Sequence, residues 1–421
     1  MSNKGKGRAL KPAAQRAFVP KLRFPEFRNE PGWRDSPLAD VATFYNGRAF
    51  QQEELLEQGK YKVLRVGNFF TSNNWYYSDL ELDETKYCDS GDLLYAWSAS
   101  FGPRIWQGEK VIYHYHIWKV VGKDIVNQDF LYVVLNYETE KIKSQSANGL
   151  GLLHITKGTI ESWTSYFPSR AEQKKITAAL SSLDEQIKSQ TQKLNALKTH
   201  KKGLMQQLFP AEGETLPKLR FAQFWDSGRW KKQTIGKALI EQSRPINMGD
   251  EEECSLVTVK RRYGGVVSRG TFKGKSIKVK TQFLLQENDF LISKRQIVHC
   301  ACGVVPKYLA GSIVSNEYSV LRARDGFDIS FLNYFAQQPN VSQSFLRCSI
   351  GIVIEKMLFK LNEWLMQEFL FPSLPEQQRI ADCLSSLDEL IAVQTQKLAV
   401  LKAHKKGLMQ RLFPALDEVQ G

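Results

Sequence analysis

Two stretches of the chain carry apolar residues at alternating spacings of four and three, which is the spacing of a coiled-coil seam. The first runs from about Glu172 to Leu208 and the second from about Glu376 to Leu412, and neither contains an internal proline. We therefore predict two long helices. The predicted seam positions are Ile176, Leu180, Leu183, Ile187, Gln190, Leu194, Leu197, Leu204 and Leu208 in the first helix, and Ile380, Leu384, Leu387, Ile391, Gln394, Leu398, Leu401, Leu408 and Leu412 in the second, with Lys201 and Lys405 filling the gaps.

The two stretches are copies of each other. The segment that starts at Phe167 returns at Phe371 without a gap, and a shorter segment that contains Trp33 returns around Trp230. Such repetition indicates a duplicated architecture, in which each copy has an entry segment, an insert and a helical spacer. The predicted boundaries are a basic tail at 1–19, a first insert domain at 20–167, a spacer at 168–210, a second insert domain at 211–371, a second spacer at 372–414 and a tail at 415–421.

The connectivity of the chain favours antiparallel pairing of the two helices. Parallel pairing would require the chain to travel back about 55 Å before the second insert, because about 37 residues rise ~1.5 Å each. Gln190 and Gln394 lie near the helix midpoints, so we predict that they face each other and set the register at some cost in stability. The alternative is that both glutamines point to solvent.

Both inserts contain short apolar and aromatic runs separated by Asn, Asp and Gly, a pattern typical of strands. The runs at 60–70, 91–97 and 110–121 of the first insert, and residues 276–280 of the second, are predicted as strands. Residues 129–142 and 159–166 of the first insert, and residues 329–338 of the second, are predicted as helices. The predicted fold class is therefore α+β. Two mixed α+β insert domains are separated by two long helices paired as an antiparallel coiled coil, in a pseudo-twofold, circular-looking organisation.

Charge points to a polyanionic partner. The net charge is +14, and residues 1–34 hold nine Lys or Arg against two Glu. Residues 259–280 hold eight basic residues and no acid, with Tyr263 and Phe272 between them, which suits the neutralisation of phosphates. The alternatives are a disordered tail and a solvated basic face. Scattered cysteines, together with the lack of a long apolar run or targeting signal, predict a cytoplasmic protein.

Polar residues on the predicted strands of each insert are the candidates for contact with DNA. Arg and Lys match the acceptor edge of guanine, and Asn and Gln match adenine. The candidates are Arg65, Asn68, Arg104, His114, His116 and Lys119 in the first insert, and Lys260, Arg261, Arg262, Arg269, Lys273, Lys294, Arg295 and Gln296 in the second.

Enzyme and metal sites find little support in the sequence. Residues 270–276 resemble a phosphate-binding loop, but Arg269 stands where the motif requires its first glycine. His299 to Cys302 lack a second ligand pair at zinc spacing. We therefore predict no catalytic residues and no metal. A self-sufficient nuclease or methyltransferase, or a coiled-coil adaptor that does not bind nucleic acid, remains as an alternative.

The repeated segments resemble the DNA specificity subunit of type I restriction-modification systems. The resemblance rests on Pro168 with Glu172 and Gln173, on Pro372 with Glu376 and Gln377, and on residues 91–102 and 288–294 of the inserts. It implies a non-catalytic subunit that reads a bipartite asymmetric sequence in double-stranded DNA. It also implies docking of two methyltransferase subunits and, in the full complex, of restriction-translocation subunits. No cofactor would be bound by this chain, and S-adenosylmethionine, ATP and magnesium would be bound by the partners.

Overall fold

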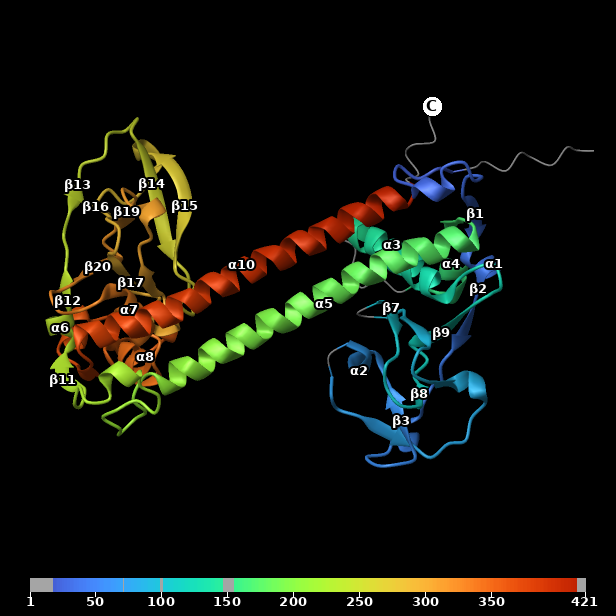
Figure 1. Cartoon of the computed structure of the whole chain (residues 1–421), viewed down its shortest axis with the longest axis horizontal. Coiled ribbons are helices and arrows are strands. Elements are labelled where there is room, and N and C mark those ends of the chain that lie inside the picture. Colours follow the sequence, from blue (N-terminus) through green and yellow to red (C-terminus); the bar gives the residue numbers. More distant parts are fainter. Residues whose placement is uncertain (1–17, 71, 99–100, 147–154, 415–421) are drawn as a thin grey trace, which may run out of the picture. The chain divides into compact units, whose positions relative to one another are not determined.

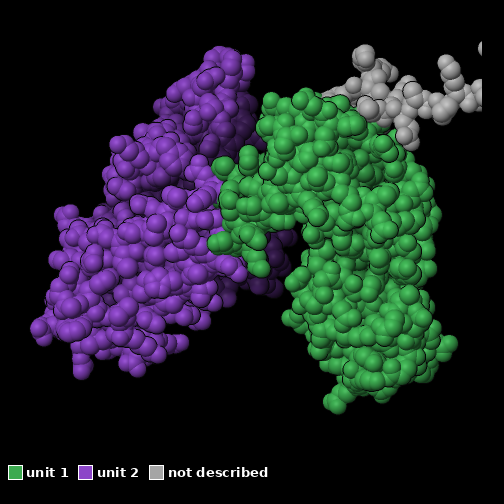
Figure 2. Space-filling model, turned by 45° about the vertical axis from the view of Figure 1, so that its right-hand side comes forward, with its two compact units in different colours: residues 1–189, 398–421 green, residues 190–397 purple. Residues whose placement is uncertain are grey.

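The computed structural model describes residues 18–70, 72–98, 101–146 and 155–414 (Figure 1). The predicted tail at 415–421, and all of the predicted tail at 1–19 except its last two residues, lie outside this description. The chain forms two compact units (Figure 2). The first unit contains residues 1–189 and 398–421, and the second contains residues 190–397. Each unit thus combines one insert with parts of both spacers.

Two long helices, α5 (Arg170–Gln207) and α10 (Leu374–Leu412), confirm the helices predicted from the seam. In the second unit, Nζ of Lys201 on α5 lies 2.7 Å from Oδ2 of Asp388 on α10. In the first unit, Nζ of Lys405 on α10 lies 2.7 Å from Oδ2 of Asp184 on α5. Within each unit the early part of one helix therefore contacts the late part of the other, so the local pairing is antiparallel as predicted.

The predicted seam residues are buried or half-buried in the described structure. The ends of the seam are best covered, with Ile176, Leu180, Ile380, Leu384 and Leu412 each at most 1% exposed. Gln190 and Gln394 are half-buried, and the side-chain oxygen of each is buried without a hydrogen-bond partner among the described residues. Their contact with each other stays a prediction.

The first insert consists of two four-stranded sheets, a two-stranded ribbon and helices. The sheet orders are β2-β9-β6-β7 and β4-β3-β8-β5, and the ribbon is β1-β10. The strands are β1 (Arg34–Pro37), β2 (Ala42–Asn46), β3 (Tyr61–Leu64), β4 (Tyr76–Ser78), β5 (Tyr87–Cys88), β6 (Leu93–Ala96), β7 (Gly102–Ile105), β8 (Val111–Tyr113), β9 (Ile117–Gly122) and β10 (Thr164–Phe167), and the helices are α1 (Leu38–Val41), α2 (Val66–Phe70), α3 (Gln128–Ser146) and α4 (Lys157–Glu161), with short 3₁₀ turns at Pro25–Phe27, Gln52–Glu54 and Glu84–Lys86.

The second insert has a four-stranded sheet, a five-stranded sheet and two ribbons. The sheet orders are β12-β20-β17-β18 and β13-β16-β19-β14-β15, and the ribbons are β11-β23 and β21-β22. The strands are β11 (Lys231–Thr234), β12 (Leu239–Glu241), β13 (Pro245–Ile246), β14 (Glu253–Val259), β15 (Val266–Lys273), β16 (Gln282–Leu284), β17 (Phe290–Ser293), β18 (Cys302–Val304), β19 (Ile313–Ser315), β20 (Tyr318–Ala323), β21 (Ser349–Ile350), β22 (Leu358–Phe359) and β23 (Glu368–Phe371), and the helices are α6 (Ile235–Ala238), α7 (Ile329–Phe335), α8 (Pro339–Arg347) and α9 (Leu361–Leu365), with 3₁₀ turns at Ala222–Phe224, Gly274–Ser276, Ile297–His299, Lys307–Leu309 and Ile354–Lys356.

The two inserts share one topology. The order β2-β9-β6-β7 corresponds to β12-β20-β17-β18, and β5-β8-β3-β4 corresponds to β16-β19-β14-β15. Each insert also has one parallel pair at the same place, β3 with β8 and β14 with β19. The mixed α+β class is therefore confirmed, and the duplication extends into the inserts, although their sequences differ.

Some local predictions were wrong. Residues 66–70 follow β3 as helix α2 rather than as strand. Of the helix predicted at 159–166, the first residues lie in α4, but residues 164–166 lie in strand β10. Residues 277–280 form no strand. Short apolar runs fit either kind of element, and here tertiary packing decides between them.

A buried ionic clasp joins the entry segment of each unit to the start of a long helix. In the first unit, Nε and Nη2 of Arg23 donate to the two carboxylate oxygens of Glu172 at 2.9 and 2.7 Å. Trp33 also donates to Glu172, at 3.3 Å. In the second unit, Arg220 donates to Glu376 at 2.8 and 2.7 Å, and Trp230 donates at 3.2 Å.

The neighbouring glutamine of each copy holds the insert. Gln173 accepts a hydrogen bond from the backbone of Asn127 at 2.7 Å, and Gln377 accepts one from the backbone of Asp328 at 3.0 Å. Both glutamines also donate to the carbonyl of the preceding proline, Pro168 or Pro372, at 3.0 Å. The repeated Glu-Gln pair is thus explained, because the glutamate binds the entry segment and the glutamine binds the insert.

A phenylalanine just after the C-terminal end of each long helix packs into the core of one unit. Phe413, after α10, stacks on Phe130 and Tyr137 of the first unit. Phe209, after α5, stacks on Phe331 of the second unit. Both phenylalanines are 2% exposed. The first unit is therefore completed by residues from the far end of the chain.

Candidate nucleic-acid interface

Three loops of the first insert converge on His114. The backbone of Arg48 donates to the carbonyl of Tyr113 at 2.9 Å, and the backbone of His114 donates to the carbonyl of Leu64 at 2.9 Å. A Cβ on Gly47 would lie 2.4 Å from the carbonyl oxygen of His114, so this close approach requires glycine. The approach brings Arg48, Arg65 and His114 to one place.

Burial sets the charge state of His114. Burial first, and then the charges of His116 and Arg65, lower the pKa of His114 to about 4. The imidazole is therefore neutral near pH 7, with one nitrogen able to donate and the other able to accept. A neutral imidazole can pair with a base edge, whereas a charged one would mainly attract phosphate.

Aromatic rings form a continuous row across this surface. The ring of Phe50 is nearly parallel to that of His114, and the ring centroids of His114 and Tyr115 are 4.5 Å apart. Tyr115 and His116 are 3.9 Å apart, and His116 lies 4.9 Å from Trp97. Because Tyr115 is 40% exposed, the row offers ring faces and edges to a partner.

The arginines of the first insert also rest on rings. The Arg65 guanidinium lies 4.2 Å from the ring centroid of Tyr76, and that of Arg104 lies 4.7 Å from Phe70. Nε of Arg48, Nε of Arg65 and Oδ1 of Asn68 are buried without hydrogen-bond partners among the described residues. Such atoms favour a bound partner, because an unsatisfied buried polar group is costly.

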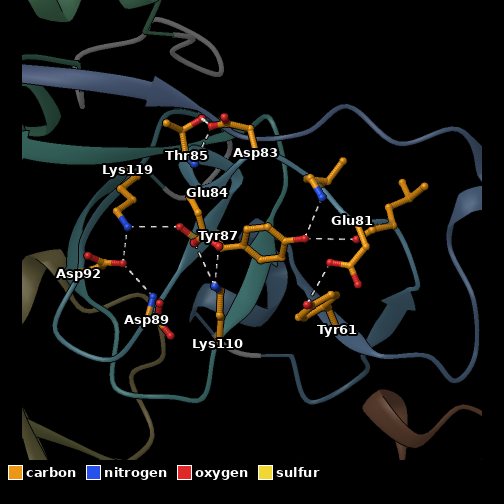
Figure 3. Close-up of polar contacts among 12 residues, drawn as sticks. Tyr61, Glu81, Asp83, Glu84, Thr85, Tyr87, Asp89, Asp92, Lys110 and Lys119 are labelled. Atoms are coloured by element: carbon orange, nitrogen blue, oxygen red, sulfur yellow. Dashed lines mark hydrogen bonds and ion pairs between the residues drawn. The ribbon is translucent and has the colours of Figure 1, made fainter.

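Lys119 belongs to a different environment (Figure 3). Its Nζ lies 2.7 Å from Oδ2 of Asp92 and 3.3 Å from the carbonyl oxygen of Tyr87. Asp92 in turn accepts a hydrogen bond from the backbone of Asp89 at 2.8 Å. Lys119 therefore lies in an internal ion pair that holds β9 against the turn before β6.

The structure corrects the expectation that the first set of candidates lies on strands. Arg104 lies on β7 and Lys119 on β9. Asn68 lies on helix α2, Arg65 precedes that helix, and His114 and His116 lie in the turn between β8 and β9. The run of residues 110–121 alternates in hydrophobicity like one strand, but a turn divides it into two.

In the second insert, the turn between β14 and β15 packs on the loop after β17. Arg262 and Tyr263 donate from their backbones to His299 and Cys300 at 2.8 and 2.9 Å. Nε of Arg261 donates to Oε1 of Gln296 at 2.8 Å. This packing brings Lys260, Arg261 and Arg262 together with Lys294, Arg295 and Gln296.

The backbone at this place is strained. Arg262, Tyr263 and Cys300 have φ values of 55°, 56° and 59°. Non-glycine residues adopt this left-handed region only where the surroundings enforce it, and such residues cluster at binding sites.

The remaining candidates of the second insert lie apart from that turn. Arg269 is exposed on β15, and Lys273 ends the same strand. The basic stretch is not free of carboxylates in three dimensions, because Glu251 pairs with both Lys273 and Lys275 at 2.8 and 2.7 Å. Arg295 likewise pairs with Glu317 at 2.7 Å. Within the described residues of this stretch, residues 260–262, Arg269 and Lys278 therefore have no carboxylate partner, and three of these five charges are adjacent at residues 260–262.

Sequence reasoning missed Arg48. Its place beside His114 arises from the approach of residues far apart in the chain, and its Nη2 pairs with Oε1 of Glu54 at 2.7 Å, which leaves Nε buried without a partner among the described residues. The clasp residues Arg23 and Arg220 were also missed as functional positions, although each lies within a repeated entry segment, and this repetition was a usable signal.

No group of three or more His, Cys, Asp or Glu residues that could hold a metal ion occurs within the described ranges. Burial raises the pKa of the Cys302 thiol far above its usual range. Over the same ranges, no helix has the length and apolar character needed to cross a bilayer.

The fold and its surfaces define a duplicated scaffold that carries two different polar recognition surfaces. Residues 30–199 match the family model described as the type I restriction modification DNA specificity domain. The resemblance drawn from the sequence is therefore confirmed, since this part of the chain is similar to the DNA specificity domain of type I restriction-modification systems.

Individual relatives agree in fold and length. The specificity subunit of the type I restriction enzyme MjaVIII from Methanocaldococcus jannaschii is 23% identical over an alignment of 348 residues, which covers 77% of this chain and 79% of that protein. The crystal structure of the S subunit of a type I restriction-modification system from M. genitalium gives a TM-score of 0.57 at 15% identity, with 94% of this chain and all of that chain covered.

A third comparison is a chain from a structural study of complex assembly and conformational transition of the type I system. It gives a TM-score of 0.51 at 16% identity and covers 91% of this chain and 96% of that chain. At 15% and 16% identity, these two structural comparisons show a shared fold.

Proposed function

We propose that each insert is a target-recognition domain that reads one half of a bipartite, asymmetric DNA site. The domains are residues 20–167 and 211–371, and the spacers are residues 168–210 and 372–414. The main support is that two inserts of one topology carry different polar surfaces, one around His114 and one around Arg261. Two unlike surfaces on a repeated scaffold suit two unlike base sequences.

Within the first domain, Arg48, Arg65, Asn68, Arg104, His114 and His116 contact DNA. In the second domain Lys260, Arg261, Arg262, Lys294, Arg295 and Gln296 contact base edges or nearby phosphates, while Arg269 and Lys273 follow the backbone. Lys119 supports its domain through Asp92. The ring row and the unsatisfied atoms of Arg48, Arg65 and Asn68 support the first assignment.

The spacers dock two methyltransferase subunits, and restriction-translocation subunits join the full complex. S-adenosylmethionine, ATP and magnesium are bound by these partners. Because its target is cellular DNA, the chain works in the cytoplasm. The family match and the clasp, which fixes each domain to the start of a spacer, support a role in assembly.

The decisive experiment is genome-wide methylation mapping in a host that co-expresses this chain with its methyltransferase partner. We expect one motif with two specified halves and unspecified bases between them. Exchanging residues 211–371 for the matching insert of a relative should change one half only. A change in both halves, or a motif without a gap, would contradict the proposal.

Point variants sharpen the test. Arg261→Ala with Arg262→Ala should relax base preference in one half, since a good bidentate contact contributes about 1–3 kcal/mol of discrimination. The matched control is Lys273→Ala with Lys275→Ala on the same hairpin, where both lysines are paired with Glu251. The control should leave base preference unchanged.

The spacer length tests the role of the paired helices. Adding one heptad to both α5 and α10 should lengthen the unread gap by about three base pairs, because seven residues rise about 10.5 Å and a base pair rises ~3.4 Å. A motif with an unchanged gap would show that the helices do not set the spacing.

A further inference from the structure

A lysine-lined groove lies in the first unit between α3 and the last turns of α10. It has a volume of about 660 Å³, and its walls carry Lys141 and Lys143 from α3 and Lys402, Lys405 and Lys406 from α10. Glu140 is the one acidic residue in its lining. Tyr137 and Met409 supply an apolar floor.

Two of these ammonium groups are uncompensated. Lys405 pairs with Asp184, Lys141 with Glu138 and Lys143 with Glu140. Lys402 and Lys406 are exposed and have no ion-pair partner within the part of the chain that the structure describes. Two unpaired ammonium groups next to three paired lysines favour the entry of an anion into the groove.

The groove adjoins a strand of the candidate DNA surface. Nζ of Lys143 lies 5.3 Å from the ring centroid of Phe101, and a Cβ on Gly102 would lie 3.9 Å from the same Nζ. Gly102 begins β7, the strand that carries Arg104. A single polyanion bound along β7 would therefore extend into the groove.

The second unit lacks this arrangement although it contains the same helix sequence. Lys198, Lys201 and Lys202 are the copies of Lys402, Lys405 and Lys406. The counterpart of α3 is α7, which ends at Phe335, and the chain from there to Leu346 contains no lysine. The longer α3 makes the groove a property of the first unit.

We propose that this groove binds backbone phosphates of the DNA that the first recognition domain reads. The inference rests on the proposed function and adds a phosphate-anchoring site outside the base-reading loops. Lysine suits the task, because its ammonium is a compact charge that contacts phosphates without base preference. The groove would bind DNA on the side of α3 next to β7.

The test compares two double variants of the full chain, Lys402→Ala with Lys406→Ala and the matched control Lys198→Ala with Lys202→Ala. All four lysines are exposed, so both variants should fold, and circular dichroism checks this. Fluorescence anisotropy with a labelled duplex, at salt from about 50 to about 200 mM, measures the slope of log affinity against log salt. Each lost phosphate contact should reduce the slope by about 0.9.

We expect the groove variant to reduce the slope by one to two contacts, while the control retains the wild-type slope. Equal reductions in both variants would show a diffuse basic field and overturn the proposal, as would no reduction in either. If the groove variant keeps the slope but loses co-purification with the methyltransferase, the occupant is an acidic protein segment, and the proposal is also wrong. Failure of the proposed function itself would look different, because the wild-type chain would then show no salt-dependent DNA binding.

Discussion

The two units have the same contacts between entry segment and long helix, but their exposed loops differ. Arg23, Glu172 and Trp33 of the first unit have the same contacts as Arg220, Glu376 and Trp230 of the second. Around the recognition loops, by contrast, the first unit uses aromatic rings and a neutral histidine, and the second uses a strained basic turn. The clasp contacts are therefore the same in both copies, whereas the loops that we propose to contact DNA differ between them.

If the clasp stabilises both units in the same way, breaking it should cause the largest loss in the free energy of unfolding. The loss should be equal in the two units. Glu172→Gln leaves the buried Arg23 without its countercharge, since Arg23 is 7% and Glu172 1% exposed. We expect a loss of about 3–5 kcal/mol in the free energy of unfolding, because removing one partner of a buried ion pair strands the other. Urea denaturation of Glu172→Gln and of Glu376→Gln measures both.

A second variant separates loss of the ion pair from loss of the fold. Replacing both partners, with Arg23→Met and Glu172→Leu, removes the stranded charge and should recover most of the stability. Equal instability of the single and double variants would show that the ion pair is not the source of the effect.

Removing the phenylalanine that follows each long helix should lower the free energy of unfolding by a comparable, slightly smaller amount. Phe413→Ala removes a ring that stacks on Phe130 and Tyr137, and we expect the first unit to lose about 3–4 kcal/mol. Phe209→Ala should do the same to the second unit. Limited proteolysis with mass spectrometry identifies which unit opens, and opening of the second unit in Phe413→Ala would contradict the assignment.

The central glutamines should have an effect of the opposite sign. Replacing both Gln190 and Gln394 by Leu removes two buried, unsatisfied side-chain oxygens. We expect the free energy of unfolding to rise by about 1–3 kcal/mol. Thermal denaturation measures it, with Gln192→Leu and Gln396→Leu at exposed positions as the control. A lower melting temperature would show that the glutamines have partners and are needed.

The smallest effect should come from His114, and it should depend on pH. Its pKa is about 4 in the folded chain and 6.5 when exposed, so between these values the unfolded chain binds a proton that the folded chain does not. Stability should therefore fall as the pH decreases from 6.5 towards 4.

The variant His114→Asn should lose less stability between about pH 7 and about pH 5 than the wild type, as urea denaturation at both values would measure. The same change at His404, which is exposed on α10, is the control and should leave the difference as in the wild type. If His114→Asn loses as much stability between these two pH values as the wild type, another group binds the proton on unfolding.

The helices were predictable because their signal is local and repeated. Alternation of four and three over Ile176 to Leu208 specifies one apolar face, and the copy at Ile380 to Leu412 repeats it position by position. The basic turn of the second insert was partly predictable too, since Arg261 and Arg262 are adjacent in the sequence. The turn at His114 was not, because the strands on either side alternate in the same way as the turn itself.

By itself, the sequence determined a duplicated chain with two long helices, two α+β inserts and an excess of positive charge, because repetition, periodicity and charge are properties of the order of residues. Only the tertiary structure decided which charges stay uncompensated. Glu251 and Asp92 neutralise lysines that look free in the sequence, and Glu54 pairs with Arg48, whereas Lys402 and Lys406 have no ion-pair partner among the described residues. The physical reason is that an electrostatic interaction depends on distance in space, and folding sets that distance.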